Sequence, residues 1–150
     1  MSQYGDAAEA YFRKGYNCCQ SVAAPFAAQL GLTEATALRM ASGFGGGIGR
    51  MREVCGAFCG VTLVISLKYA DPADPQDKSR IYAIVQQLAR QYKARSGRGT
   101  YLCRELLEGA GATGGAQAEA RTPDYYKRRP CAELVRMAAE LAADYLEQNP

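Results

Sequence analysis

The stretch CGAFCGVTLVISLKYA, residues 55–70, is the strongest indication of the fold of this chain. It carries no charge before Lys68 and shows no polar face at helical spacing, which is typical of a helix buried on all sides. The β-branched run VTLVIS would suit a strand, but it lies without a break inside the longer apolar segment. The sequence therefore predicts a central helix over residues 55–70, against which other elements pack.

The flanking sequence predicts further helices and no strand. Asn17 is a favourable N-cap for a helix that Gly31 closes, and Asp74 followed by Pro75 predicts the start of another. The expected helices cover residues 2–14, 18–30, 33–41, 55–70, 75–94, 103–109 and 131–147. We therefore predict an all-α fold, with residues 1–150 forming one domain, a compact bundle of about five to seven helices with Gly-rich loops.

Composition narrows the classes of function. A chain of 150 residues is long enough for one hydrophobic core, and a net charge of +3 is small for a dedicated nucleic-acid binder. The N-terminal sequence lacks the apolar run of a secretion signal, and the longest apolar stretch, residues 61–67, is too short to span a membrane. We therefore expect a cytoplasmic protein with no membrane insertion, whose cysteines are reduced rather than joined in structural disulfides.

The chain has six cysteines and no histidine. Without histidine there is no His-ligated zinc, no Ser-His-Asp or Cys-His nucleophile pair and no histidine-held haem, so any metal chemistry must use thiolates. Four cysteines each stand at the predicted start of a separate helix: Cys18, Cys55, Cys103 and Cys131. Unpaired backbone N–H groups and the helix dipole favour a thiolate there, so together these residues would suit an anionic, sulfur-bound group.

The spacing of these four residues leaves alternatives open. It matches neither the C-x-x-C pairs of zinc ribbons nor the clustered cysteines of ferredoxins, so four unrelated core cysteines would give the same pattern. The two additional cysteines are expected to pack as small hydrophobes. Cys19 directly follows Cys18, whereas Cys59 lies one helical turn beyond Cys55 and is within reach of a site built on it.

Two glycine-rich stretches connect the predicted helices. The first, residues 43–53, fits neither the dinucleotide fingerprint nor the P-loop. We expect its glycines to let the backbone pack against the cysteine site and to direct N–H groups toward sulfur, with Arg50 and Arg52 at the mouth; a flexible connector is the alternative. The second stretch, residues 109–120, is expected to be a mobile loop. The basic residues within 90–98 and 121–129 are expected to lie on solvated faces, or alternatively to compensate negative charge at a cysteine site.

Six motifs along the chain resemble those of a known family. They are GYNCCQSV (15–22), GFGGGIGRM (43–51), CGAFCG (55–60), LKYAD (67–71), CRELL (103–107) and PCAELV (130–135). With them the chain resembles the CGCAxxGCC-motif family (C_GCAxxG_C_C), small proteins described as redox-active and related to the cysteine domain of split-Soret cytochromes. The resemblance implies redox activity or cluster binding, and the family's four characteristic cysteines fall on Cys18, Cys55, Cys103 and Cys131. Cys19 and Cys59 depart from its pattern.

Three functional hypotheses follow. In the first, the four cysteines bind an iron–sulfur cluster, or alternatively zinc, for electron transfer. In the second, the protein is a metal-free thiol–disulfide oxidoreductase with Cys55 as nucleophile and Cys18 or Cys103 as its resolving partner. In the third, it is a non-catalytic carrier of metal or sulfur that docks through residues 122–129. The expected partner is an electron-transfer protein or a transporter, and the Ala-rich helix faces are compatible with a homodimer.

Overall fold

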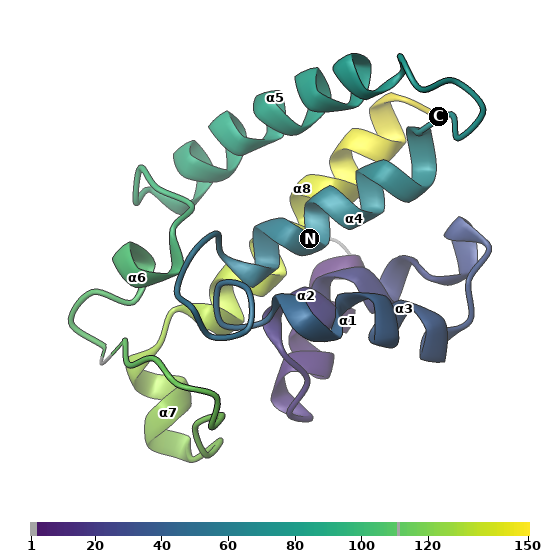
Figure 1. The fold of residues 1–150 in the computed structure, drawn as a ribbon. Helices are drawn as coiled ribbons and strands as arrows, with labels where there is room; N and C mark the ends of the chain where they lie inside the picture. Colours follow the sequence, from purple (N-terminus) through teal and green to yellow (C-terminus); the bar gives the residue numbers. More distant parts are fainter. Residues whose placement is uncertain (1–2, 111) are drawn as a thin grey trace.

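The computed structural model describes residues 3–110 and 112–150. Within these residues it contains eight α-helices and no β-strand, which confirms the all-α prediction (Figure 1). The helices are α1 (Gln3–Arg13), α2 (Cys18–Ala23), α3 (Glu34–Ala41), α4 (Gly56–Tyr69), α5 (Lys78–Ser96), α6 (Cys103–Leu106), α7 (Pro123–Arg128) and α8 (Cys131–Gln148). Short 3₁₀ turns follow α2 and α3, at Ala24–Phe26, Ala28–Leu30 and Ser42–Phe44.

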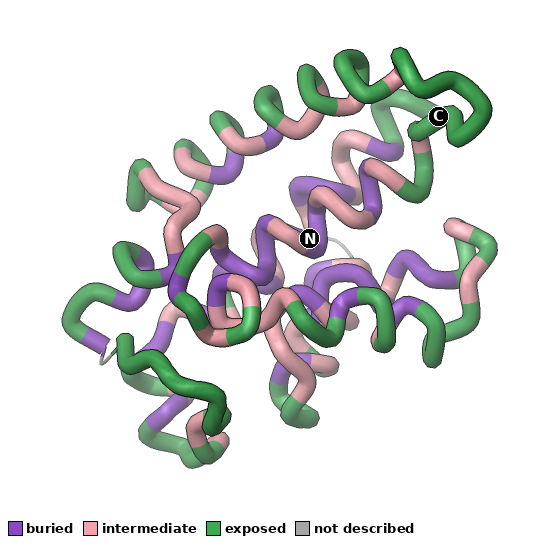
Figure 2. The backbone as a smooth tube through the Cα atoms, in the orientation of Figure 1, coloured by how far each residue is buried: buried purple, intermediate pink, exposed green. Residues whose placement is uncertain are grey.

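Helix α4 is the centre of the bundle, as its apolar sequence predicts. It packs against α2, α5 and α8, and α8 packs in turn against α1. Buried backbone runs along α4 and α8, whereas α5 keeps an exposed outer face (Figure 2). Val61, Val64 and Ile65 of α4 are at most 1% exposed, and burying side chains of this kind stabilises the fold by about 2 kcal/mol each.

Two glycines bring α2 unusually close to α4. A Cβ atom on Gly60 would lie 2.7 Å from the Cβ of Val22, and one on Gly56 would lie 3.2 Å from the Cβ of Cys18. Any larger residue at either position would push the helices apart. This close crossing sets the first turn of α2, which begins at Cys18, beside the start of α4.

The predicted helix over residues 18–30 is not continuous. Helix α2 ends at Ala23, and two 3₁₀ turns carry the chain on to Gly31, whose φ of 74° closes the segment. Pro25 is the physical reason, because it lacks the N–H that an α-helix needs at this position.

Other parts of the helix prediction also differ from the structure, and the helix expected over residues 103–109 already ends at Leu106. Helix α5 begins at Lys78 rather than at Pro75, because Asp71, Asp74 and Asp77 instead accept bonds from nearby backbone N–H groups and form turns. Helix α7 was not predicted, although Thr122 caps it and Pro123 occupies its first position. None of the helices in the described residues is long and apolar enough to cross a membrane.

Candidate functional site

The four cysteines predicted to act together line a single cavity of about 410 Å³. Cys18, Cys103 and Cys131 are the first residues of α2, α6 and α8, and Cys55 is the N-cap residue of α4. The prediction that each stands at the start of a separate helix is therefore confirmed. The N-terminal ends of these helices lie beside the glycine-rich loop (Figure 1).

Local hydrogen bonds fix where each helix begins. The side chain of Asn17 accepts from the N–H of Gln20 at 2.9 Å, and the side chain of Gln20 accepts from the N–H of Asn17 at 3.0 Å. This reciprocal capping box starts α2 at Cys18.

Cys55 and Cys103 are positioned by a short antiparallel bridge between Val54 and Leu102. The N–H of Cys55 donates to the carbonyl of Tyr101, and the N–H of Cys103 donates to the carbonyl of Glu53, both at 2.7 Å. The bridge therefore holds the starts of α4 and α6 next to each other, although nearly fifty residues separate them in the sequence.

The glycine-rich loop adopts a left-handed path around the cavity. Gly46, Gly47 and Gly49 have φ between 56° and 73°, and so does the β-branched Ile48 at 65°. Positive φ is rare and costly for such a residue, so the surrounding contacts must impose it. A Cβ on Gly47 would lie 2.7 Å from the Cβ of Cys103, which confirms the expected close approach of the loop to the cysteine site.

The N–H groups of this loop are used differently from the prediction. The amides of residues 48–53 donate to carbonyl groups within residues 43–48, at 2.9–3.2 Å. They therefore stabilise the loop itself, and side chains supply donors to sulfur instead.

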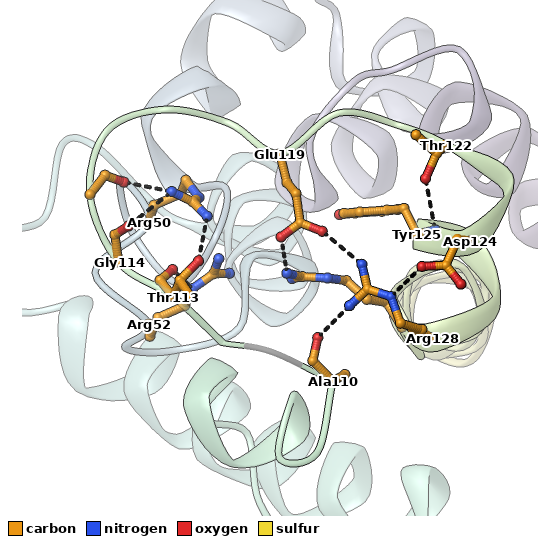
Figure 3. Close-up of polar contacts among 12 residues, drawn as sticks. Arg50, Arg52, Ala110, Thr113, Gly114, Glu119, Thr122, Asp124, Tyr125 and Arg128 are labelled. Atoms are coloured by element: carbon orange, nitrogen blue, oxygen red, sulfur yellow. Dashed lines mark hydrogen bonds and ion pairs between the residues drawn. The ribbon is translucent and has the colours of Figure 1, made fainter.

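Arginines of the loop reach the cavity and the segment that covers it (Figure 3). The buried Arg52 places Nη1 3.5 Å from the Sγ of Cys103 and donates through Nε to the carbonyl of Thr113 at 2.9 Å. Arg50 donates to the carbonyls of Gly114 and Gly115 at 3.1 and 2.8 Å. The segment expected to be a mobile loop is thus held by side chains from the glycine-rich loop.

Two further arginines, Arg121 and Arg129, line the cavity. Arg129 is buried, pairs with Glu119 at 2.6 Å and lies over the ring of Tyr125. Arg121 donates to the carbonyls of Phe12 and Tyr16 at 2.6 and 2.9 Å.

The cavity wall is therefore strongly positive when its thiols are protonated. It carries the four guanidinium groups of Arg50, Arg52, Arg121 and Arg129 against the single carboxylate of Glu119. A cavity with this balance favours negative charge on its cysteines or on a bound group.

The cysteines differ in how readily they ionise. A hydrogen bond from the thiol of Cys18, assisted by Arg129 and Arg121, lowers the pKa of Cys131, whereas the same contact and burial raise the pKa of Cys18. Burial raises the pKa of Cys55 to about 12, against a hydrogen bond from Tyr92. Burial also raises the pKa of Cys103, and Arg52 opposes it. In the absence of a bound group, negative charge is therefore most stable on Cys131.

Tyr92 is a site residue that the sequence did not reveal. Its hydroxyl donates to the Sγ of Cys55 at 3.2 Å, and the side chain is fully buried. The sequence pattern placed it only on the apolar face of α5. Its role follows from a chemical requirement, because a buried tyrosine hydroxyl needs a hydrogen-bond partner.

The remaining two cysteines lie outside the cavity. Cys19 is fully buried in a separate cluster with Ala23 and Ala41, and the partly exposed Cys59 packs against the same cluster. The close crossing of α2 and α4 therefore separates the cysteines into a set of four and a set of two.

The spacing of the sulfur atoms bears on which group they suit. In the described part of the chain, no three Cys, Asp or Glu residues lie close enough together to hold a single metal ion. The ligands of one zinc ion must all lie about 2.3 Å from it, so zinc would require the cysteines to move inward. Four cysteines on one positively charged cavity are the type and number of ligands that a four-thiolate iron–sulfur cluster uses.

Comparison with known proteins gives a match to a family model. Residues 16–145 match the model of the family described as "Putative redox-active protein (C_GCAxxG_C_C)". No curated protein and no solved structure matches the chain. Because the family match covers most of the sequence and all four cavity cysteines, the chain belongs to the C_GCAxxG_C_C family.

Proposed function

We propose that Cys18, Cys55, Cys103 and Cys131 bind an iron–sulfur cluster, and that the protein transfers electrons through it. The observation that carries the proposal is the convergence of these four residues on one cavity of about 410 Å³. The arginines of the wall support it, because clusters ligated by four thiolates are anionic. Such a cluster, held by these four cysteines, would supply one-electron redox chemistry.

The residues around the cavity have defined tasks in this proposal. Arg52 and Tyr92 each direct a donor at sulfur, toward Cys103 and Cys55 respectively. Hydrogen bonds and positive charge near the sulfurs favour the more negative, reduced state and raise the reduction potential. Replacing Tyr92 by Phe is therefore expected to make the midpoint potential more negative while leaving the iron content unchanged.

Metal and acid-labile sulfide content test the proposal on protein purified without oxygen. We expect iron and sulfide in matched amounts, with broad visible absorption that dithionite bleaches. Cys103→Ala should lose most of the iron, whereas the matched control Cys59→Ala should retain it. Zinc without sulfide, or protein free of iron after anaerobic reconstitution, would contradict cluster binding.

A second candidate function rests on the contact between Cys18 and Cys131. A thiol hydrogen-bonded to a neighbouring thiolate is the arrangement of a reactive dithiol. In this candidate, Cys131 attacks a partner disulfide and releases one thiol, and Cys18 then displaces the second thiol to form a Cys18–Cys131 disulfide. The contact favours Cys131 as nucleophile over the Cys55 suggested by the sequence, since burial raises the pKa of Cys55 to about 12.

Thiol trapping separates the two candidates. Alkylation before and after treatment with dithiothreitol, followed by mass spectrometry, would show a reversible Cys18–Cys131 disulfide in metal-free protein. The dithiol function is refuted if Cys131→Ala leaves the reaction with small disulfides unaltered.

A further inference from the structure

Cys19 and Cys59 form a second pair of thiols that the four-cysteine site does not use. Cys19 comes from α2 and Cys59 from α4, and both pack in the cluster that also contains Ala23 and Ala41. Each is a free thiol in this structure. The two residues are therefore neighbours across a helix crossing, although forty positions separate them in the sequence.

The backbones of α2 and α4 come close together at this crossing. A Cβ on Gly56 would lie 3.3 Å from the backbone nitrogen of Cys19, and one on Gly60 would lie 3.1 Å from its carbonyl oxygen. The backbone of α2 at Cys19 thus lies against α4 between these two glycines, and Cys59 directly precedes the second of them. A disulfide requires this kind of close backbone approach, with Cα atoms about 4.4–6.8 Å apart.

The exposure of the two thiols indicates which of them reacts first. Cys19 is completely buried, whereas Cys59 is partly exposed and its Sγ lies 3.8 Å from the carbonyl oxygen of Val54. A reagent from solution can therefore reach Cys59 first. Cys19 is then the protected neighbour that completes an internal disulfide.

We propose that Cys19 and Cys59 are a second redox-active dithiol, oxidised to an internal disulfide by low-molecular-weight disulfides such as oxidised glutathione. The Cys59 sulfur attacks one sulfur of the reagent, and one thiol leaves. The Cys19 sulfur then attacks the Cys59 sulfur of the mixed disulfide, and the second thiol leaves. Two protein thiols are oxidised, one small disulfide is reduced to two thiols, and the two thiol protons pass to the leaving thiolates.

The Cys19–Cys59 disulfide would link α2 covalently to α4. The link would lie close to Cys18 and Cys55, which stand at the starts of these helices and line the cavity. The link would close a loop of about 40 residues, and the loss of freedom in the unfolded chain stabilises the folded one. For a domain of this size we expect the melting temperature to rise by about 10 °C on oxidation and to return with dithiothreitol. The proposal does not depend on whether the cavity binds a cluster.

The experiment treats the full chain, purified without oxygen, with oxidised glutathione, and then alkylates the remaining thiols and digests with trypsin. Cys18 and Cys19 share the peptide of residues 15–39, and Cys55 and Cys59 share that of residues 53–68. The double variant Cys18→Ala/Cys55→Ala leaves one cysteine in each peptide. We expect it to retain the link between the two peptides, together with the rise in melting temperature.

Single variants give the same test in a chain that keeps the cavity cysteines. Cys19→Ala and Cys59→Ala should each abolish the link and the thermal shift without changing the iron content, so the outcome is separate from that of cluster binding. The proposal is overturned if wild-type protein shows no link between these peptides, or if the link persists in either single variant.

Discussion

At the scale of single residues, the site depends on backbone positions that only glycine occupies without cost. Gly47 and Gly49 belong to the same left-handed loop, with φ of 73° and 56°. They differ in their surroundings, because a Cβ on Gly47 would lie 2.7 Å from the Cβ of Cys103, whereas the nearest atom to one on Gly49 would be 4.0 Å away. The pair separates the cost of conformation from the cost of crowding Cys103 and the backbone of Arg52 and Glu53.

Gly47→Ala and Gly49→Ala should therefore destabilise the protein unequally. We expect Gly49→Ala to reduce the free energy of unfolding by about 1 kcal/mol for the positive φ alone. Gly47→Ala should cost about 3 kcal/mol, since the clash adds to the same strain. Denaturant unfolding of both variants measures the difference, and equal losses would refute the packing role of Gly47.

At the scale of elements, the contact between α2 and α4 reverses the usual effect of glycine in a helix. Replacing a helical glycine by alanine normally stabilises by up to about 1 kcal/mol. In α4 the added Cβ of Gly60→Ala would lie 2.7 Å from the Cβ of Val22 on α2. The same substitution at Gly5 in α1 meets mainly the side chains of Glu140 and Arg136, which can rotate away.

We therefore expect Gly60→Ala to lower the free energy of unfolding by about 2 kcal/mol, and Gly5→Ala to change it by less than about 1 kcal/mol. The Gly60 variant should also bind less iron, because the first turns of α2 and α4 carry two of the four cavity cysteines. Thermal unfolding and iron content check both effects. A stabilised Gly60→Ala protein would show that the helices adjust freely.

At the scale of the whole molecule, charged groups connect the two ends of the chain. Arg136 of α8 pairs with Asp6 of α1 at 2.7 Å and with Glu9 at 3.0 Å. Hydrogen bonds from Arg13 and Arg136 lower the pKa of Glu9. A carboxylate whose pKa is depressed in the folded state stabilises it above the unfolded pKa, and this contribution is lost as the pH falls through the folded pKa.

Glu9→Gln should therefore reduce stability at pH 7 and have a smaller effect at pH 3, because the contribution of the charge is progressively lost as the pH falls through the lowered pKa of Glu9. Because the pairs are partly exposed, we expect a loss of at most about 1 kcal/mol at pH 7. Unfolding free energies at the two pH values provide the measurement, with Glu147→Gln at the exposed end of α8 as the matched control. An effect independent of pH would assign the loss to packing rather than charge.

The helical class, the central position of residues 55–70 and the placement of four cysteines at helix starts could all be predicted from the sequence alone. These features follow from local patterns of apolar residues, capping groups and glycine, which act over a few residues. Helix α7 was missed in the prediction, although Thr122 caps it. The predicted start of α5 was too early, because three aspartates form turns there.

The set of groups that surround the cysteines depends on tertiary contacts and could not be predicted from local sequence. Arg121 and Glu119 line the cavity and Tyr92 donates to Cys55 from distant parts of the chain, and no local pattern marks them as site residues. The division of the cysteines into a set of four and a set of two was also invisible in the sequence, where Cys18 and Cys19 are adjacent. It arises because neighbouring residues of a helix point about 100° apart, so the close crossing with α4 directs one thiol into the cavity and the other into the core.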